Sequence, residues 1–243
     1  LTEQSLSVEQ LLRHDNLTHV NAGHKLNLSE IILRGNYPEI ASKKQIDKNI
    51  WCGSYIATYL ERDIRNLSQV GDLNQFERFL RLCATRTGQI LNLSEMARDI
   101  GVAVPTAKRW LSMLETGYQI FLLYPYFRNI GKRMIKSPKL YFTDTALAAY
   151  LLGITDARAL RNSQYFGALF ETLVVTDFWK RFVHLGQSPR MYYLRTRDGL
   201  EVDLVLETRE KLNLIEIKSA MTITSQHASG LIRARADLQA KIG

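Results

Sequence analysis

The hydrophobic pattern of the sequence changes once, near Pro189, and this change limits the possible fold more than any other feature. Upstream, small and apolar residues recur at helical spacing, and the clearest run places seven of them on one face of a helix: Ile46, Ile50, Gly53, Ala57, Leu60, Ile64 and Leu67. Downstream, three apolar segments at 191–195, 200–206 and 212–218 are separated by turns of hairpin length. A helical part followed by a run of strands predicts an α+β fold.

The basic charge of the chain is concentrated in one block. The 243 residues carry a formal net charge of +8, yet residues 76–140 alone contain 11 basic and 4 acidic side chains. A localised basic block indicates a polyanionic partner, most often nucleic acid. The alternative is a solvated basic face that binds nothing.

Other features of the sequence concern its compartment. The apolar runs are too short to cross a membrane, and Leu1-Thr2-Glu3 does not begin a signal peptide. Cys52 and Cys83 are far apart and lack the spacing of metal ligands, which is typical of a reducing environment. We therefore expect a cytoplasmic protein with no membrane partner. The sequence does not start with methionine, so we also expect a fragment or a processed chain.

Residues 74–143 follow the order helix, tight turn, helix, hairpin. Gly101 separates two short helices, and the second begins near Pro105, a residue that the first helical turn tolerates. Strands are expected at 120–127 and 140–142 because these segments are aromatic and aliphatic. This order is typical of a winged helix-turn-helix, in which the second helix enters the major groove of DNA and the wing follows the phosphates.

Both of the predicted DNA-facing surfaces are basic. The second helix buries an apolar face with Trp110 and leaves Lys108 and Arg109 outside, while the wing adds five more cations: Arg128, Lys132, Arg133, Lys136 and Lys139. Few of these side chains suit base readout, so we expect binding led by the phosphate backbone and sensitive to salt. The alternative is a winged helix that serves as a protein-interaction or spacer module.

The strands beyond residue 200 carry charges in apolar surroundings. Because alternate residues of a strand share a face, we expect Leu200, Val202, Leu204 and Leu206 on one side of their strand and Glu201 and Asp203 on the other. In the next strand Glu216 and Lys218 share a face. Two adjacent strands of this kind bring Asp203, Glu216 and Lys218 together.

Such a cluster has the composition of a divalent-metal site. Two carboxylates are the oxygen ligands that Mg²⁺ or Mn²⁺ prefers, and the lysine can orient a water or stabilise the charge of a phosphorane. Glu171, on the helix that precedes these strands, is a candidate third carboxylate. The alternative is a structural ion pair, in which Lys218 neutralises Asp203 or Glu216 and nothing is catalysed.

Two of these segments resemble a known fold. Glu201-Val202-Asp203-Leu204-Val205 and Ile215-Glu216-Ile217-Lys218-Ser219 are similar to the motif of PD-(D/E)XK, or restriction-endonuclease-like, domains. A wider set of segments resembles the C-terminal half of prokaryotic AAA+-type ATPases whose last domain has no known function: Leu33-Arg34-Gly35, Tyr37-Pro38-Glu39, Thr58–Ile64, Lys132-Arg133, Lys136–Lys139, Tyr141–Asp144 and Leu194-Arg195-Thr196. The resemblance covers about residues 28–235.

The resemblance implies three consecutive parts: a helical region at 1–73, a winged helix-turn-helix at 74–143 and a nuclease-like α/β domain at 144–243. It implies that Asp203, Glu216 and Lys218 are the nuclease motif, with Asp203 and Glu216 as metal ligands and Glu171 as the helix carboxylate. Such proteins usually begin with a P-loop ATPase core, but this sequence contains no Gly-x-x-x-x-Gly-Lys-Ser/Thr motif and therefore no ATP site. The fold usually adds a strand after its last helix, which we expect to be missing here.

Three functions remain open from the sequence. The first is a metal-dependent nuclease module that binds DNA through its winged helix. The second is a non-catalytic module for DNA binding or protein interaction, with an inactive nuclease-like domain. The third is a remnant that associates with itself through an exposed sheet edge. An ATPase that acts in trans is a further expected partner.

Overall fold

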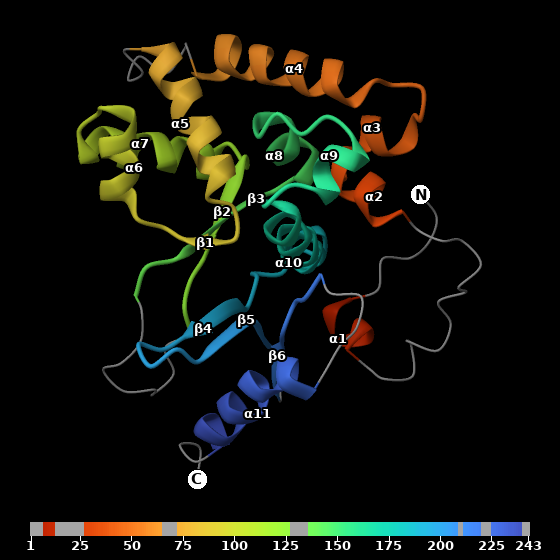
Figure 1. Cartoon of the computed structure of the whole chain (residues 1–243), viewed down its shortest axis with the longest axis vertical. Helices are drawn as coiled ribbons and strands as arrows, with labels where there is room; N and C mark the ends of the chain where they lie inside the picture. The colour runs from red at the N-terminus through yellow and green to blue at the C-terminus, as the bar shows by residue number, and fades with distance from the viewer. Residues whose placement is uncertain are drawn as a thin grey trace. The chain divides into compact units, whose positions relative to one another are not determined.

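The computed structural model describes residues 7–12, 27–64, 72–126, 136–208, 211–219 and 225–239. It combines helices with two antiparallel sheets of three strands each, which confirms the predicted α+β class (Figure 1). The chain divides into two compact units, each built from segments that are separate in the sequence. We call them the helical unit, residues 27–122 and 139–173, and the terminal unit, residues 1–26, 123–138 and 174–243.

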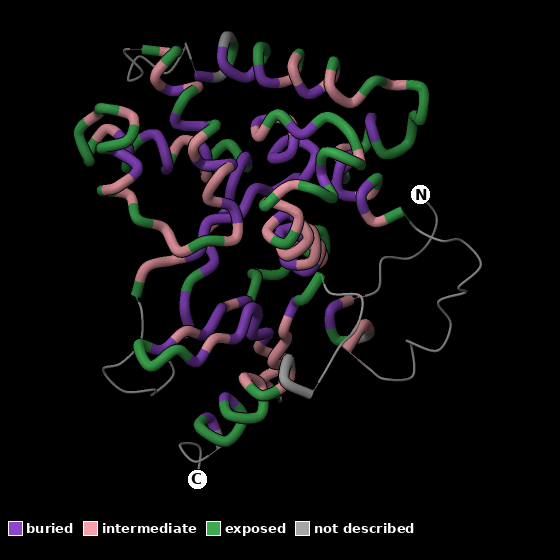
Figure 2. The backbone as a smooth tube through the Cα atoms, in the orientation of Figure 1, coloured by how far each residue is buried: buried purple, intermediate pink, exposed green. Residues whose placement is uncertain are grey.

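The helical unit contains most of the elements. In chain order they are α2 (Leu28–Arg34), α3 (Pro38–Ser42), α4 (Lys48–Thr58), the π-helix η2 (Tyr59–Ile64), α5 (Leu73–Thr85), β1 (Gln89–Ile90), α6 (Leu93–Ile100), α7 (Val104–Thr116), β2 (Ile120–Leu123), β3 (Lys139–Phe142), α8 (Thr145–Leu151) and α9 (Ala157–Arg161). Buried apolar residues of all these elements except α3 and β1 form one core, and Ile40 of α3 belongs to a second cluster with Cys52 and Ala146 (Figure 2). In the described part of the chain, no helix has the length and hydropathy that a membrane span requires.

The predicted order of helix, turn, helix and two strands is present, although β2 ends at Leu123 and not at residue 127. Helix α6 ends where Gly101 adopts a left-handed conformation, and α7 begins with proline in its first turn, both as predicted. The inner face of α7 is buried through Trp110, Leu111 and Leu114. The short strand β1 was not predicted, because two residues carry no periodic pattern. It pairs antiparallel with β3, and the sheet order is β1-β3-β2.

The predicted continuous helix over 46–67 is wrong in its second half. The regular helix α4 ends at Thr58, and a π-helical segment follows to Ile64. Ile50, placed on the inner face by the sequence pattern, is 71% exposed, whereas Cys52 and Ile56 are buried. A π-turn contains one more residue than an α-turn, so it shifts the helical phase. The inner face of α4 and the inner face of the π-helical segment are therefore out of phase, and a single 3.6-residue period counted across both assigns some residues to the wrong face.

Asp144 joins two distant turns of the helical unit. Its Oδ1 accepts hydrogen bonds from the backbone N–H groups of Ala146 and Leu147, which caps α8. Its Oδ2 accepts a third from the N–H of Asn36 at 2.7 Å, directly after α2. Gly35 ends α2 with a φ of +61°, next to this carboxylate. The turn at 35–36 and the start of α8 are therefore held by one buried side chain.

The terminal unit contains α1 (Val8–Leu11), β4 (Met191–Arg195), β5 (Glu201–Glu207), β6 (Leu212–Ile215) and α11 (Ser225–Gln239). The strand order is β4-β5-β6, and α11 packs on β5 and β6 (Figure 1). Tyr124 and Tyr126 continue the sheet beyond β4, because their backbone groups exchange hydrogen bonds with Tyr193. Helix α10 (Phe166–His184) begins in the helical unit and ends in the terminal unit.

We predict that Gly35→Ala strongly destabilises the helical unit. The added Cβ would overlap Asp144 Oδ1, and the backbone conformation of Gly35 is one that only glycine adopts easily. We expect the free energy of unfolding to fall by about 3 kcal/mol or more, the sum of strain and a broken cap. Urea unfolding followed by circular dichroism measures this change.

Gly101→Ala is the matched control, because Gly101 also has a positive φ but has no atom within 4 Å of an added Cβ. It should cost only the conformational term of about 1–2 kcal/mol. Equal losses for the two variants would show that the Asp144 contact contributes nothing.

Candidate functional site

Asp203, Glu216 and Lys218 come together at one end of the β5–β6 pair. Lys218 Nζ lies 2.6 Å from Glu216 Oε1 and 3.7 Å from Asp203 Oδ2. Asp203 is 6% exposed, while the Lys218 side chain is 41% exposed. The cluster of two carboxylates and one lysine that the sequence predicted is therefore present, with its acidic groups enclosed and its lysine open to solvent.

The end of strand β6 depends on Asp203. The ladder between β5 and β6 runs to the pair Leu204 and Ile215. Beyond it, the backbone N–H of Ile217 donates to Asp203 Oδ2 at 2.8 Å, so a side chain takes the place of a strand partner. This is why β6 stops at Ile215 although the sequence predicted a strand to Lys218. The stop leaves Glu216 and Lys218 in an extended segment beside Asp203.

A β-bulge lies at Asp203. Tyr192 pairs with Val205 and Leu194 with Val202, so β5 has one residue more than β4 in this interval. The predicted simple alternation along β5 is therefore wrong. Val202 and Val205 belong to the same apolar cluster beneath α11, whereas Leu204 does not. Bulges re-aim side chains and are frequent next to active sites, and this one contains Asp203.

Glu216 is the least satisfied member of the cluster. Its Oε2 is buried and accepts no hydrogen bond from any residue that the structure describes. Burial raises the pKa of the Glu216 carboxyl, and Asp203 and Glu201 raise it further, although the hydrogen bond from Lys218 opposes them. Like charges on neighbouring strands are destabilising. A group placed at such a cost is a candidate for binding a cation.

The donor set fits a magnesium-like cation with few protein ligands. Mg²⁺ is commonly held by one or two carboxylates, with waters and substrate phosphates completing the shell. Asp203 and Glu216 supply two carboxylates. Glu216 Oε2 accepts no hydrogen bond from a described residue, so it is available as a metal ligand. Among the described residues, no group of three or more histidine, cysteine or acidic side chains is placed to hold a metal. The site therefore does not resemble a cage built only from protein ligands.

Glu171 and Lys139 pair with one another in the helical unit. Glu171 Oε1 accepts hydrogen bonds from Lys139 Nζ at 3.1 Å and from the Tyr141 hydroxyl at 2.5 Å. The predicted role of Lys139 as an exposed DNA contact is wrong, because its side chain is 3% exposed and faces this carboxylate. The predicted role of Glu171 as a third carboxylate beside Asp203 stays a prediction.

The other predicted DNA contacts divide into two groups. Lys108 and Arg109 are exposed on the outer side of α7, and neither makes an ion pair with a residue that the structure describes. Lys136 is also exposed. The remaining three, Arg128, Lys132 and Arg133, lie outside the described residues.

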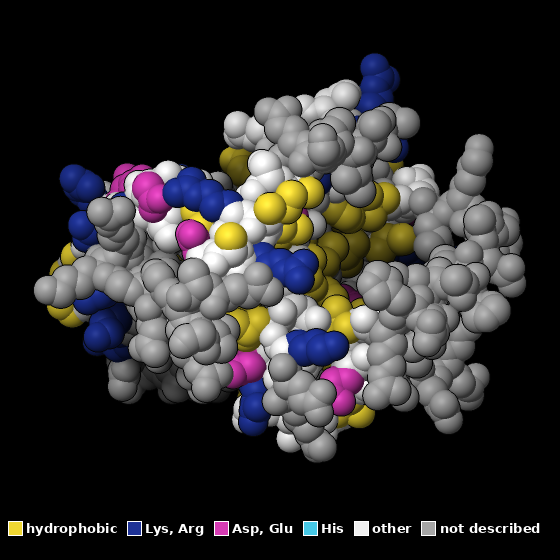
Figure 3. Space-filling model, turned by 90° about the horizontal axis from the view of Figure 1, so that it is seen from below, with side chains coloured by type: hydrophobic (Ala, Val, Ile, Leu, Met, Phe, Trp, Pro, Cys, Tyr) yellow, Lys and Arg dark blue, Asp and Glu magenta, His cyan; other side chains and the backbone are white. Residues whose placement is uncertain are grey.

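Two features of the terminal unit were given no role from the sequence. Arg195 Nη1 lies 3.5 Å from Glu201 Oε2, on the strand pair that carries Asp203. Arg233 of α11 pairs with Asp198 in the turn between β4 and β5. The face drawn in Figure 3 likewise shows basic and acidic side chains next to one another. Arg195 and Glu201 are opposite one another because of the register between β4 and β5, and the sequence alone does not show this register.

The fold and the site together define the class of this protein. It is an α+β protein with a cluster of two carboxylates and a lysine on its second sheet. The chain belongs to the family of the domain of unknown function DUF8612, which matches residues 25–158. Residues 166–243 match a second domain of unknown function, DUF4143. DUF4143 is typically found with N-terminal AAA ATPase domains. The match to DUF4143 agrees with the predicted resemblance, and the association of this chain with an ATPase stays a prediction.

Relatives of the chain occur in mycobacteria. It is 35% identical over 208 residues to the uncharacterized protein Rv2008c of Mycobacterium tuberculosis and equally to the uncharacterized protein Mb2031c of Mycobacterium bovis. The alignment covers 85% of this chain and 46% of each relative, so the chain spans less than half of their length. No solved structure matches the chain.

We predict that Glu216→Gln removes a pH-dependent loss of stability. The pKa of Glu216 is raised above its ordinary value of 4.5 in the folded protein, so the folded state binds the proton more tightly than the unfolded chain. The stability from this group is full below the ordinary pKa and is lost as the pH rises through the raised value.

Urea unfolding at about pH 4 and about pH 8 tests the sign of this effect. Relative to the natural chain, Glu216→Gln should gain stability with rising pH, on the order of 1 kcal/mol for each unit of pKa shift removed. Asp237→Asn, an exposed carboxylate on α11, is the control and should show no such trend. A flat difference for Glu216→Gln would mean that burial does not perturb this carboxyl.

Proposed function

We propose that the terminal unit carries a divalent-metal-dependent site for hydrolysis of DNA phosphodiester bonds, in a module of an ATPase-associated protein. One observation carries the proposal: two enclosed carboxylates converge on one exposed lysine, and a buried oxygen of Glu216 accepts no hydrogen bond from a described residue. The bulge at Asp203 and the early end of β6 support it, since both give up regular strand pairing at this point.

In this site Asp203 and Glu216 would hold Mg²⁺ or Mn²⁺. Bound there, the cation would stabilise the negative charge that develops on the phosphate. Lys218 is the only exposed member of the cluster, so its ammonium group is available to orient the attacking water or to neutralise the phosphorane. Ile217 N–H holds the Asp203 carboxylate at 2.8 Å and is a positioning group.

A second candidate function is DNA binding without cleavage. It is favoured by the order of α5, β1, α6, α7, β2 and β3, which is the order of a winged helix-turn-helix, and by the exposed Lys108 and Arg109 on α7. Lys218 also pairs so closely with Glu216 that the cluster can be read as a satisfied ion pair. In this reading the sheet charges are structural and the helical unit acts alone.

We predict that Asp203→Asn abolishes cleavage and leaves DNA binding intact. Loss of a metal-binding carboxylate should lower the cleavage rate by at least about a hundredfold, because the cation's charge stabilisation is worth several kcal/mol. The assay uses single-stranded, duplex and branched DNA with Mg²⁺, Mn²⁺ or EDTA, and a gel shift runs on the same panel.

Asp198→Asn is the matched control, because Asp198 is an exposed aspartate in the turn between β4 and β5 that pairs with Arg233 rather than Lys218. It should cleave like the natural chain. Binding without cleavage in every protein and every metal would reject the nuclease and leave the second candidate.

We predict that Lys108→Ala with Arg109→Ala weakens duplex binding on all sequences alike. Each phosphate contact that is lost should lower the slope of log affinity against log salt by about 1. A fluorescence titration at several salt concentrations measures both quantities. Arg98→Ala, an exposed cation on α6, is the comparison. An unchanged slope for the α7 variant would exclude α7 as the DNA-facing helix.

A further inference from the structure

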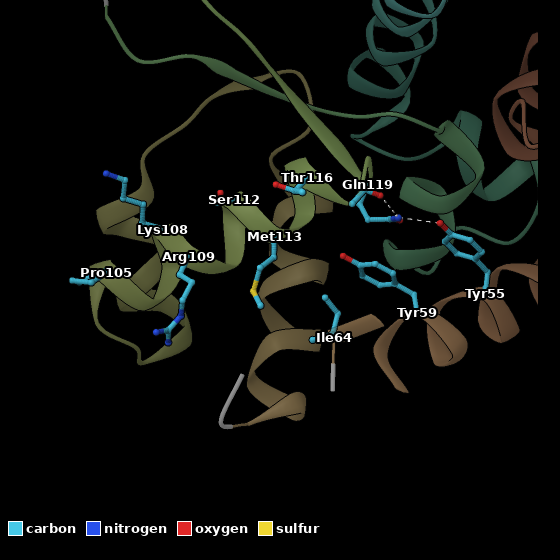
Figure 4. A pocket seen from close by; sticks show the side chains of 11 residues that line it. Tyr55, Tyr59, Ile64, Pro105, Lys108, Arg109, Ser112, Met113, Thr116 and Gln119 are labelled. Carbon is cyan, nitrogen blue, oxygen red and sulfur yellow. Dashed lines mark hydrogen bonds between the residues drawn. The ribbon is translucent and has the colours of Figure 1, made fainter. Parts of the chain in front are cut away.

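A pocket of about 740 Å³ lies on the outer side of α7, within the helical unit. Helix α7 forms one wall of this pocket. The end of α4 and the π-helix η2 form the opposite wall (Figure 4). Its lining residues, all of them described, are Tyr55, Tyr59, Ile64, Pro105, Lys108, Arg109, Ser112, Met113, Thr116, Gly117 and Gln119. This volume is in the range of sites that enclose small organic ligands.

The α7 wall supplies the charge of the pocket. Lys108, Arg109, Ser112 and Thr116 recur along one side of the helix, and none of them makes a hydrogen bond or an ion pair through its side chain with a described residue. None of the lining residues carries a carboxylate. Figure 4 shows Arg109 and Met113 extending from α7 on the same side. The wall therefore offers two cations and two hydroxyls, and an anion complements it.

The opposite wall is aromatic and apolar. Tyr59 and Ile64 come from the π-helical segment, and Tyr55 precedes it. Tyr55 is held in place, since it stacks on Trp51 at 5.2 Å and its hydroxyl accepts a hydrogen bond from Gln119 Nε2 at 2.9 Å. A π-helix is a rare conformation that is frequent at functional sites. Here the first and last residues of the π-helical segment, Tyr59 and Ile64, both line the pocket.

We propose that this pocket binds one nucleotide unit, with the base against Tyr59 and Met113 and the phosphate at Arg109. Arg109 and Met113 extend from α7 on the same side, whereas Lys108 extends in another direction (Figure 4). A phosphate fits the Arg109 guanidinium, and Ser112 and Thr116 offer hydroxyls to the sugar or the base edge. The unit is either a free mononucleotide or a base of single-stranded nucleic acid. The proposal does not depend on cleavage at Asp203, which lies in the terminal unit.

The test fills the pocket without changing its charge. Ser112→Trp places a large side chain inside it from an exposed position, and Ser94→Trp, from an exposed position on α6, is the matched control. The probes are deoxyadenosine monophosphate, deoxyadenosine and a short single-stranded oligonucleotide, titrated by calorimetry on the full chain without added metal. Circular dichroism confirms that both variants fold.

We expect saturable binding of the monophosphate or the oligonucleotide that Ser112→Trp abolishes and Ser94→Trp retains. Arg109→Ala should weaken it about tenfold or more, and the nucleoside should bind weaker than its monophosphate by a similar factor, since both changes remove a charge-assisted hydrogen bond. Binding of the monophosphate identifies a free nucleotide as the ligand, and binding of the oligonucleotide alone identifies a strand. Binding of neither, or binding that Ser112→Trp leaves unchanged, overturns the proposal.

This experiment separates the pocket from the DNA-facing role of α7, which also uses Lys108 and Arg109. Duplex binding through α7 requires the charges of Lys108 and Arg109 but does not require an empty pocket. We therefore expect Ser112→Trp to abolish nucleotide binding and to leave duplex affinity unchanged. Duplex affinity and mononucleotide affinity therefore fail independently.

Discussion

The hydrogen bond from the Ile217 N–H to Asp203 Oδ2 is the interaction on which the candidate site depends. An N–H at the end of a strand needs an acceptor, and here the acceptor is a carboxylate instead of a carbonyl. The exchange ends β6 at Ile215, fixes one Asp203 oxygen and places Glu216 and Lys218 beside it. The backbone N–H of Ile217 thus determines that Asp203, Glu216 and Lys218 form a cluster instead of lying along two continuous strands. A hydrophobic pattern in the sequence does not show such a backbone contact.

The helical unit uses the buried Asp144 and the partly buried Glu171 for a different purpose. Asp144 receives three backbone N–H groups, and Glu171 receives the Lys139 ammonium and the Tyr141 hydroxyl. In both cases donors surround the carboxylate, which is the condition for burying a charge without a ligand. Glu216 differs, because one of its oxygens is buried and accepts no hydrogen bond from a described residue. The contrast between satisfied and unsatisfied carboxylates distinguishes structural acids from the candidate metal site.

The sequence predicted the elements whose pattern is local. The bounds of β4, the end of α6 at Gly101, and the buried face of α7 were correct because turn chemistry and one unbroken period suffice for them. Two of the failures share one cause, a change of register. The π-helix after Thr58 and the bulge at Asp203 each insert a residue, and alternation or helical phase counted across them gives the wrong face. The burial of Lys139 was missed because its partner, Glu171, lies 32 residues away.

The structure shows that part of the basic excess of residues 76–140 is neutralised by ion pairs. Arg81 pairs with Glu77, Arg86 with Glu95, and Lys139 with Glu171, so part of the excess that suggested a polyanion is neutralised inside the unit. Such pairs contribute little to long-range attraction of a ligand, whereas an unneutralised cation beside a low-dielectric wall contributes more. Of the described residues in the block, Lys108 and Arg109 meet that condition, since they line an apolar pocket and have no acidic partner there. A net charge therefore indicates an anionic partner only after the ion pairs have been subtracted. Five described cations of this block remain exposed and make no ion pair with a described residue: Arg78, Arg98, Lys108, Arg109 and Lys136. Of these five, Lys108 and Arg109 on α7 line the pocket.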